Sequence, residues 1–410
     1  MSSSNVGPLD GVRIVELATV LMAPYATQIL GDMGADVVKV ESDRLDTGRM
    51  LGAGPHPELS GVSLNLLRNK RSIQLDLKSD GGRDALFRLL STADVFVTNL
   101  RPSTLRKLGL DYDAISERFA HLLYCEAHGF RIGTPEEDRP AFDDVVQAES
   151  GLPLLAEATG DRVAFLPTVI ADKVAGLFVG QAILGALVRY VADRKGQRIE
   201  VPMFDSVLAF NFVEHLGPAT VPGNAAGYQR LLTRHRGPHR TADGYLALLP
   251  YSDADWRAIF TAAGAEDELA EPEYASVRAR HGNPDKVYAR LAELIGTKTT
   301  AQWVQIASRA GVPFGLVPSM QELADDPVLN RGVLTEAEHP HIGPYRQIRP
   351  PINYSRTPAS VRRAAPLVGE NTEEILHEAG YTRTQIDELI ASGAASQSVE
   401  TARGAADVSG

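Results

Sequence analysis

The segment VRIVELATVLMAP, residues 12–24, decides the fold class. Its β-branched run at 12–17 predicts a buried strand, and Pro24 is placed to open a helix that continues to Leu30, before Gly31. A strand that leads directly into a helix is the first half of a β-α-β unit. The turn between them contains no glycine, whereas a dinucleotide fingerprint needs glycine where the pyrophosphate approaches the backbone. The segment therefore argues against a nicotinamide-dependent dehydrogenase.

The same alternation of strands and helices continues through the first half of the chain. Short β-branched runs followed by helical patterns are typical of parallel strands joined by crossover helices. The predicted strands are 37–40, 72–77, 95–98, 122–127 and 198–203, and the predicted helices are 79–90, 144–152, 172–192 and 205–212. The helix at 172–192 is apolar around most of its circumference, so we expect it to be largely buried. The prediction is an α/β fold with a doubly wound, Rossmann-like large domain and a smaller α/β domain.

The composition changes at residues 217–227, where Gly, Pro, Ala and Asn are frequent, as in a linker. We expect the large domain to occupy 1–215, the small domain 216–330, and the chain to return to the large domain over 331–393. The small domain is predicted to contain strands at 245–249 and 314–317 and helices at 284–295 and 299–310. Residues 394–410 are rich in Ala, Ser and Gly and are predicted to be disordered.

The charge balance excludes some classes of partner. The 410 residues include 41 Lys and Arg against 52 Asp and Glu, which gives a formal net charge of −11. Because the sequence has no long basic run, this charge disfavours nucleic acid and anionic membranes as partners. The longest apolar stretch, 176–192, is interrupted by Gln181 and Arg189, which argues against a membrane span. The first residues resemble no signal peptide, so we expect a cytoplasmic protein.

Several common catalytic patterns are absent from the sequence, namely a P-loop, G-x-S-x-G, H-E-x-x-H and a cysteine pair. No metal site is predicted. His235 and His239 are separated by Gly-Pro, which indicates a surface loop rather than two ligands on one helical face. Cys125 lies in a predicted buried strand with no base beside it, so packing is its expected role. Four arginines between 230 and 240 fit either a phosphate contact or a solvated loop.

Asp172 stands at the predicted start of the long apolar helix and has two interpretations. It can be an N-cap, whose side chain binds backbone N–H groups and is held ionised by the helix dipole. It can also be a nucleophile, because a charged carboxylate in a partly dry cleft can attack an activated acyl group. Asp143, Asp144 and Glu149 are further carboxylates that fit either hydrogen-bonded partners of the site or caps and solvated surface.

The opening of the chain carries a resemblance to a known family. Residues 8–24 (PLDGVRIVELATVLMAP) and 31–41 (GDMGADVVKVE) resemble the start of the family III CoA-transferases, also called the carnitine and bile-acid-inducible CoA-transferase family. Further segments similar to the family are 69–73, 75–78, 99–102, 108–110, 196–197, 201–205, 241–245, 311–313, 326–327 and 366–371. The resemblance therefore extends over nearly the whole chain.

The resemblance implies a homodimer of two interlocked, ring-like chains. Its substrates would be an acyl-CoA and a free carboxylic acid, with coenzyme A as substrate and no permanently bound cofactor. Asp172 matches the catalytic aspartate of the family, which would attack the thioester to give an aspartyl anhydride and then an aspartyl-CoA thioester. The implied CoA contacts are Val20, Leu21, Met22, Leu75, Asp76, Leu77, Lys78, Asn99, Leu100, Arg101, Lys107, Ala141, Phe142 and Asp143.

Two other functions remain open within the same fold. One is an α-methylacyl-CoA racemase or epimerase, although Phe142 matches the position of the racemase histidine and cannot move a proton. The other is a catalytically silent acyl-CoA-binding protein. The chain also departs from family members at Ser42, where some have an arginine, and at Leu21, where the formyl-CoA enzyme has a glutamine. The region before Thr241 lacks the glycine run that covers the aspartate in some transferases.

Overall fold

The computed structural model describes residues 7–160 and 162–398, which divide into two compact units. The first unit comprises 7–146, 168–208 and 332–398, and the second comprises 147–167 and 209–331. The boundaries after residues 146 and 208 fall inside helices α6 (Asp143–Glu149) and α9 (Met203–His215). Residues 147–167, which the sequence analysis assigned to the large domain, group instead with the second unit.

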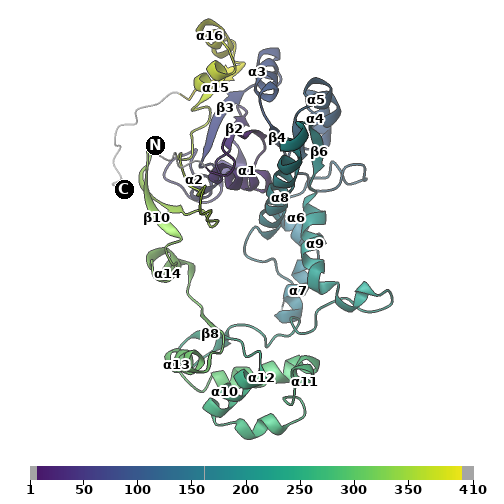
Figure 1. Ribbon diagram of the computed structural model, residues 1–410, viewed down its shortest axis with the longest axis vertical. Helices are drawn as coiled ribbons and strands as arrows, with labels where there is room; N and C mark the ends of the chain where they lie inside the picture. Colours follow the sequence, from purple (N-terminus) through teal and green to yellow (C-terminus); the bar gives the residue numbers. More distant parts are fainter. Residues whose placement is uncertain (1–6, 161, 399–410) are drawn as a thin grey trace. The chain divides into compact units, whose positions relative to one another are not determined.

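A seven-stranded sheet forms the centre of the first unit, in the order β12-β3-β2-β1-β4-β5-β6 (Figure 1). The strands are β1 (Arg13–Leu17), β2 (Asp36–Glu41), β3 (Lys70–Leu75), β4 (Val95–Thr98), β5 (Leu123–Glu126), β6 (Gln197–Glu200) and β12 (Ala395–Ser396). All neighbours pair in parallel except β12, which is antiparallel to β3. The direction of winding reverses between β1 and β4, as expected for a doubly wound sheet.

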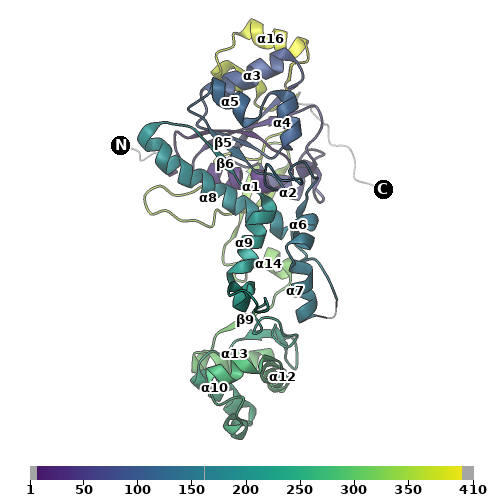
Figure 2. The same ribbon diagram turned by 90° about the vertical axis from the view of Figure 1, so that its right-hand side faces the viewer.

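Helices cover both faces of this sheet. Figure 2 shows α3, α4 and α5 on one face and α1 and α8 on the other. Leucines of α3 pack with Phe96 and Tyr124 of the sheet in one continuous hydrophobic core. The helical elements of the first unit are α1 (Met22–Asp32), η1 (Thr47–Met50), α2 (Gly61–Leu66), α3 (Asp80–Ser91), α4 (Pro102–Leu108), α5 (Tyr112–Arg118), α8 (Ile170–Asp193), α15 (Thr372–Glu378) and α16 (Arg383–Ala391).

Two elements of the first unit differ from the sequence-based expectation. The predicted disordered tail begins with β12, because its backbone pairs with Gln74 and Leu75 of β3 and Ser396 O accepts a hydrogen bond from Thr372 Oγ1. Residues 399–410 lie outside the described residues. Residues 334–348, for which the sequence predicted no strand or helix, form a β-hairpin, β10 (Leu334–His339) with β11 (Gly343–Ile348).

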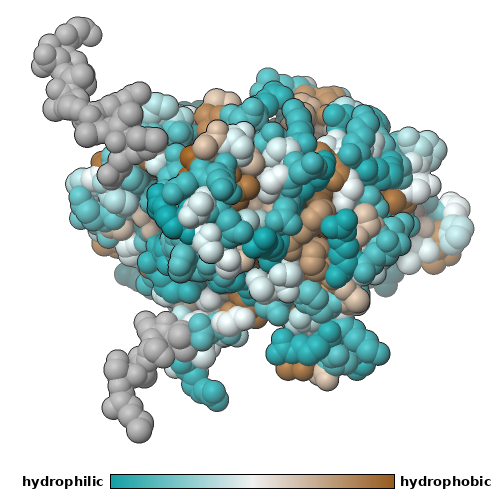
Figure 3. Space-filling model, turned by 90° about the horizontal axis from the view of Figure 1, so that it is seen from above, coloured by the Kyte–Doolittle hydropathy of each residue, from teal (hydrophilic) through white to brown (hydrophobic). Residues whose placement is uncertain are grey.

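Helix α8 is less buried than its apolar composition suggested. One side packs against α1 and the sheet, but Val188 is 78% exposed and Val191 71% exposed. Figure 3 shows another face of the molecule, seen from above, on which hydrophobic residues are scattered among hydrophilic ones. Among the described residues, α8 alone is long and apolar enough to cross a membrane, and half of its most apolar window is buried inside the protein. The expectation of a largely buried helix is therefore wrong for the single chain.

The second unit is a smaller α/β body. Its antiparallel sheet, β7-β8-β9, packs with helices α10, α12 and α13 around Trp256, Phe260 and Trp303. The predicted helix at 144–152 is broken, because Gly151 has a positive φ of 82° and separates α6 from α7. The remaining elements are α7 (Leu152–Thr159), η2 (Gly217–Thr220), β7 (His239–Arg240), β8 (Tyr245–Leu248), α10 (Asp253–Ala263), η3 (Glu266–Ala270), α11 (Val277–Gly282), α12 (Pro284–Ile295), α13 (Thr300–Ala310), β9 (Phe314–Leu316) and α14 (Met320–Asp325).

Candidate functional site

A cavity of about 540 Å³ opens at the carboxyl ends of β1 and β4, within the first unit. This is the point at which the winding of the sheet reverses, and open α/β sheets bind their ligands there. The volume suits a substrate-sized organic molecule. The predicted site residues that line it are Val20, Leu21, Met22, Asn99, Leu100, Arg101, Ala141, Phe142 and Asp172.

Asp172 is the third residue of α8 and is 92% buried from solvent, with 8% exposed. It is not the N-cap of the helix, so that interpretation is wrong. The cap is supplied from α6, where Asp143 Oδ1 accepts hydrogen bonds from the N–H groups of Ala171 (2.7 Å) and Asp172 (3.1 Å). Within the described residues, the Asp172 carboxylate itself accepts no hydrogen bond. Its oxygens therefore remain available to a substrate.

The surroundings of Asp172 favour its protonated form in the single chain. Burial, together with the like charge of Asp143, raises the pKa of Asp172 to about 7. The expectation that the helix dipole keeps this group ionised is therefore not met in the single chain, because burial and the charge of Asp143 favour the protonated form. A carboxylate with a pKa near neutrality is a stronger nucleophile than an ordinary one, and it is substantially ionised at physiological pH.

The turn between β1 and α1 forms one wall of the cavity. Its backbone is held from the adjoining strand end, where Asn99 accepts the Thr19 N–H (2.9 Å) and donates to the Thr19 carbonyl (2.8 Å). Val20 adopts a positive φ of 64°, a conformation in which a β-branched residue is rarely found. The next residues, Leu21 and Met22, continue into the first turn of α1 and complete this wall.

A second cleft of about 430 Å³ lies beside the first, along the ends of β1, β2 and β3. Asp76, Leu77 and Lys78 line it, as does Leu100. Residues common to both clefts are Thr19, Arg44, Leu100 and Thr104. The two clefts therefore share a wall, and Arg44 and Lys78 supply cations that can pair with phosphate oxygens.

Arg44 was missed by the sequence analysis. It stands two residues after Ser42, which occupies the position where an arginine was sought, and the Ser42 Oγ accepts a hydrogen bond from the Arg44 N–H. Ser42 and Arg44 both line the second cleft, so an arginine two residues after the expected position was the signal in the sequence that could have identified this contact. His128 and Met203 also line the first cavity. His128 is buried, and its Nε2 lies 3.6 Å from Glu126 Oε1.

Three predicted contact residues line neither cleft. Leu75 is fully buried in β3, and Lys107 is exposed on α4. Asp143 is buried and serves as the cap of α8 instead. The structure thus brings together most of the predicted contact set but not these three.

The other candidate residues have structural roles. Cys125 is fully buried in β5 and burial raises the pKa of its thiol, which confirms the packing role. His239 is buried in β7, where burial lowers its pKa to about 4, so its assignment to a surface loop is wrong. In the arginine cluster, Arg230 donates to the Tyr288 hydroxyl at 3.2 Å. In the part of the chain that the structure describes, no group of three or more His, Cys, Asp or Glu could hold a metal ion.

A doubly wound sheet with a cation-bearing cleft at its switch point, and with a buried carboxylate to which no described residue donates a hydrogen bond, is typical of an α/β protein that binds its ligand at that point. A family model described as CoA-transferase family III matches residues 9–372. The chain belongs to this family and is a CoA-transferase.

Curated relatives and solved structures agree with this assignment. A human succinyl-CoA:glutarate CoA-transferase is 30% identical over 96% of this chain and 91% of its own length. A formyl-CoA:oxalate CoA-transferase from Rhodopseudomonas palustris is 30% identical over 94% of this chain and 97% of its own. The crystal structure of a CAIB/BAIF family protein from Brucella suis is similar with a TM-score of 0.77 and 26% identity, covering 91% of this chain and all of the other.

Proposed function

We propose that the protein transfers CoA from an acyl-CoA thioester to a free carboxylic acid through Asp172. The observation that carries this proposal is the buried Asp172 carboxylate, which accepts no hydrogen bond from the described residues and lines the 540 Å³ cavity. Its oxygen attacks the thioester carbonyl, forming a mixed anhydride and releasing the CoA thiolate. The thiolate then attacks the aspartyl carbonyl, which gives an aspartyl-CoA thioester and frees the first acid. The acceptor carboxylate reverses both steps.

The two joined clefts support a division of the CoA molecule between them. Arg44 and Lys78 carry the charge that the 3′-phosphate and pyrophosphate require, and Leu77 offers an apolar surface beside them. Arg101 and Asn99 line the first cavity, through which the pantetheine arm would reach Asp172. The proposed contact set comprises the residues that line these clefts, and coenzyme A is bound as a substrate.

The acid substrates are proposed to include a dicarboxylate. The human and Rhodopseudomonas relatives are named for glutarate and oxalate, both of which carry two carboxyl groups. In this chain, Arg139 lines the cavity that contains Asp172 and places positive charge there for a second carboxylate.

A homodimer is proposed as the working form. Helix α8 exposes Val188 and Val191, and an apolar groove of about 580 Å³ runs beside it. The apolar residues of this groove include Tyr25, Ile29, Met33, Leu66, Leu177 and Ile352. Such surfaces are usually covered by a partner, and two interlocked, ring-like chains would cover them. Sedimentation equilibrium should give the mass of two chains, and a single-chain mass would contradict the proposal. We propose a cytoplasmic location for this assembly.

The pH profile should report the Asp172–Asp143 pair. Because the nucleophile must be ionised and its pKa is raised to about 7, kcat/KM should fall as the pH drops below neutrality. Asp143→Asn removes the like charge while its amide oxygen can still accept the two helix N–H groups. We therefore expect the acidic limb of the profile to move to lower pH in this variant. An unchanged limb would show that Asp143 does not influence the titration.

The proposed function can be tested by trapping the covalent intermediate. Incubation with a panel of acyl-CoA donors and hydroxylamine should convert the activated aspartyl group into a hydroxamate, which mass spectrometry would locate at Asp172. Hydrogen exchange at the α-carbon without CoA movement would support a racemase instead. Binding of acyl-CoA without transfer, exchange or hydroxamate would support a silent binding protein.

A further inference from the structure

The turn that leads from β1 into α1 is held in a strained backbone conformation. Val20 has a φ of 64°, in the left-handed region that β-branched residues strongly avoid. Glycine is the usual residue at such positions, and this turn has none. Strain of this kind persists only where the surrounding structure fixes it, and it is concentrated at functional sites. Val20 lines the cavity that contains Asp172.

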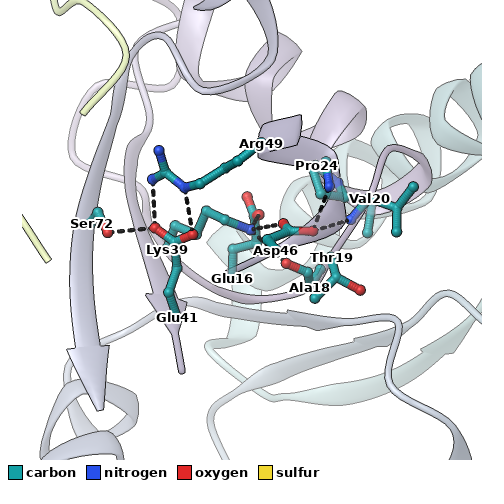
Figure 4. A network of polar contacts seen from close by, with 12 residues as sticks. Glu16, Ala18, Thr19, Val20, Pro24, Lys39, Glu41, Asp46, Arg49 and Ser72 are labelled. Carbon is teal, nitrogen blue, oxygen red and sulfur yellow. Dashed lines mark hydrogen bonds and ion pairs between the residues drawn. The ribbon is translucent and has the colours of Figure 1, made fainter. Parts of the chain in front are cut away.

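A buried carboxylate fixes this conformation from a distant part of the chain. Asp46 Oδ1 accepts the Val20 N–H at 2.9 Å, as Figure 4 shows. The same oxygen accepts the Gly48 N–H at 2.9 Å, so Asp46 also caps the short helix η1 that follows it. A Cβ on Gly48 would lie 2.5 Å from the Val20 carbonyl oxygen, which shows how closely η1 approaches the turn.

Asp46 is in turn held by a buried ion network. Lys39, which is 1% exposed, places its ammonium 3.2 Å from Asp46 Oδ2 and 3.1 Å from Glu16 Oε1. It also donates to the Ala18 carbonyl at 2.6 Å, one residue before the turn's Thr19. Burial opposes the charge on Lys39, but the surrounding carboxylates raise its pKa, so the ammonium stays protonated. Lys39 thus ties Asp46 and the end of β1 together.

We propose that Asp46 is a positioning residue, which holds Val20 in the left-handed conformation and thereby shapes the cavity wall opposite the reacting thioester. The proposal rests on the proposed function, because that function places acyl-CoA against this turn. Without the Asp46 acceptor, Val20 relaxes to negative φ and the wall formed by Leu21 and Met22 shifts. The effect falls on acyl-CoA binding and orientation, since Asp46 itself takes no part in bond making.

The test compares Asp46→Ala with the double variant Asp46→Ala/Val20→Gly. We expect Asp46→Ala to raise KM for acyl-CoA about tenfold. This is the change in affinity that corresponds to the free-energy cost of the left-handed conformation in a residue with a side chain. Glycine adopts positive φ without a restraint, so the double variant should recover most of the affinity for acyl-CoA that Asp46→Ala loses. Val20→Gly alone is the second single variant of this double-mutant cycle. A role limited to stability would not be rescued by glycine at position 20.

Asp46→Asn extends the test if the alanine variant does not fold. Its amide oxygen can still accept the Val20 N–H, so we expect a KM within about threefold of wild type despite the lost ion pair. Asp36→Asn is the matched control, since Asp36 pairs with Arg71 at 2.8 Å at the start of β2 and lines neither cleft. It should lower the melting temperature without changing KM.

Binding and turnover together separate the two proposals. Dissociation constants for CoA should follow the same order as KM across the variants, measured by calorimetry. The dissociation constants could follow this order across the variants while the wild type transfers no CoA. That result would overturn the proposed function and would still support the positioning role of Asp46. The positioning role alone would be overturned if the wild type is active and Asp46→Ala has an unaltered KM. It would also be overturned if adding Val20→Gly does not reverse the rise in KM caused by Asp46→Ala.

Discussion

Replacement of Asp172 by asparagine should abolish CoA transfer, with kcat reduced by roughly 10³-fold or more. The amide keeps the size of the carboxylate but cannot form the anhydride, and no other carboxylate among the described residues lines the first cavity except Glu137. Steady-state kinetics and CoA binding should be measured together, because binding should persist. Asp144→Asn is the matched control, since Asp144 is exposed on α6, close in sequence to the Asp143 cap.

The same asparagine variant should also be more stable than the wild type at alkaline pH. The pKa of Asp172 is raised in the folded protein, so folding favours its protonated form, and stability declines as the group ionises. This penalty is absent below about pH 4 and complete above about pH 7. Melting temperatures across this range therefore serve as a check of folding. An asparagine variant that retained full turnover would rule out Asp172 as the nucleophile.

Gly176→Ala should produce the second large effect, on both stability and activity. A Cβ at this position would lie 2.6 Å from the Met22 carbonyl oxygen and 3.2 Å from the Tyr25 ring. Because the first contact is to backbone, α8 must move away from α1, at a cost of about 1–3 kcal/mol in the free energy of unfolding. Asp172 lies one helical turn before Gly176, so the displacement should also lower kcat.

Gly185→Ala in the same helix is expected to increase stability, whereas Gly176→Ala is expected to decrease it. Among residues 7–160 and 162–398, no atom outside its own helical turn lies within 4 Å of the added Cβ. Since alanine is the better helix former, this variant should gain roughly 0.5–1 kcal/mol. Chemical denaturation of both variants measures the difference. Equal stabilities for the two alanine variants would contradict the close approach of α8 to α1.

The sequence predicted the elements of the sheet well because their signals are local. The β-branched runs of β1 and β4 and the glycine at the end of α1 each act within a few residues. The break between α6 and α7 was missed, since Gly151 inside an apolar run can either end a helix or be tolerated within it. Strand β12 was missed because Ala395 and Ser396 have no strand pattern, and only the edge of β3 makes them extended.

The site was predictable only where a family resemblance supplied it. Asp172 was found in this way, but Asp143, which caps the same helix, lies 29 residues before it, and no spacing rule links the two positions. The contact between Asp46 and Val20 spans 26 residues and depends on an unusual φ. The pKa of Asp172 depends on burial beneath other elements, which a linear sequence does not contain.

Strand β12 has a consequence for how the protein behaves at high concentration. Its antiparallel pairing with Leu75 and Gln74 occupies hydrogen-bonding groups that would otherwise line an open margin of the sheet. Unoccupied strands of this kind recruit strands from other molecules and seed aggregates. The short segment therefore protects this edge of the sheet from pairing with other molecules. Truncation before residue 394 would expose the edge, and it would also remove the carbonyl of Ala394 that accepts the Asp76 N–H at 3.0 Å, beside the second cleft.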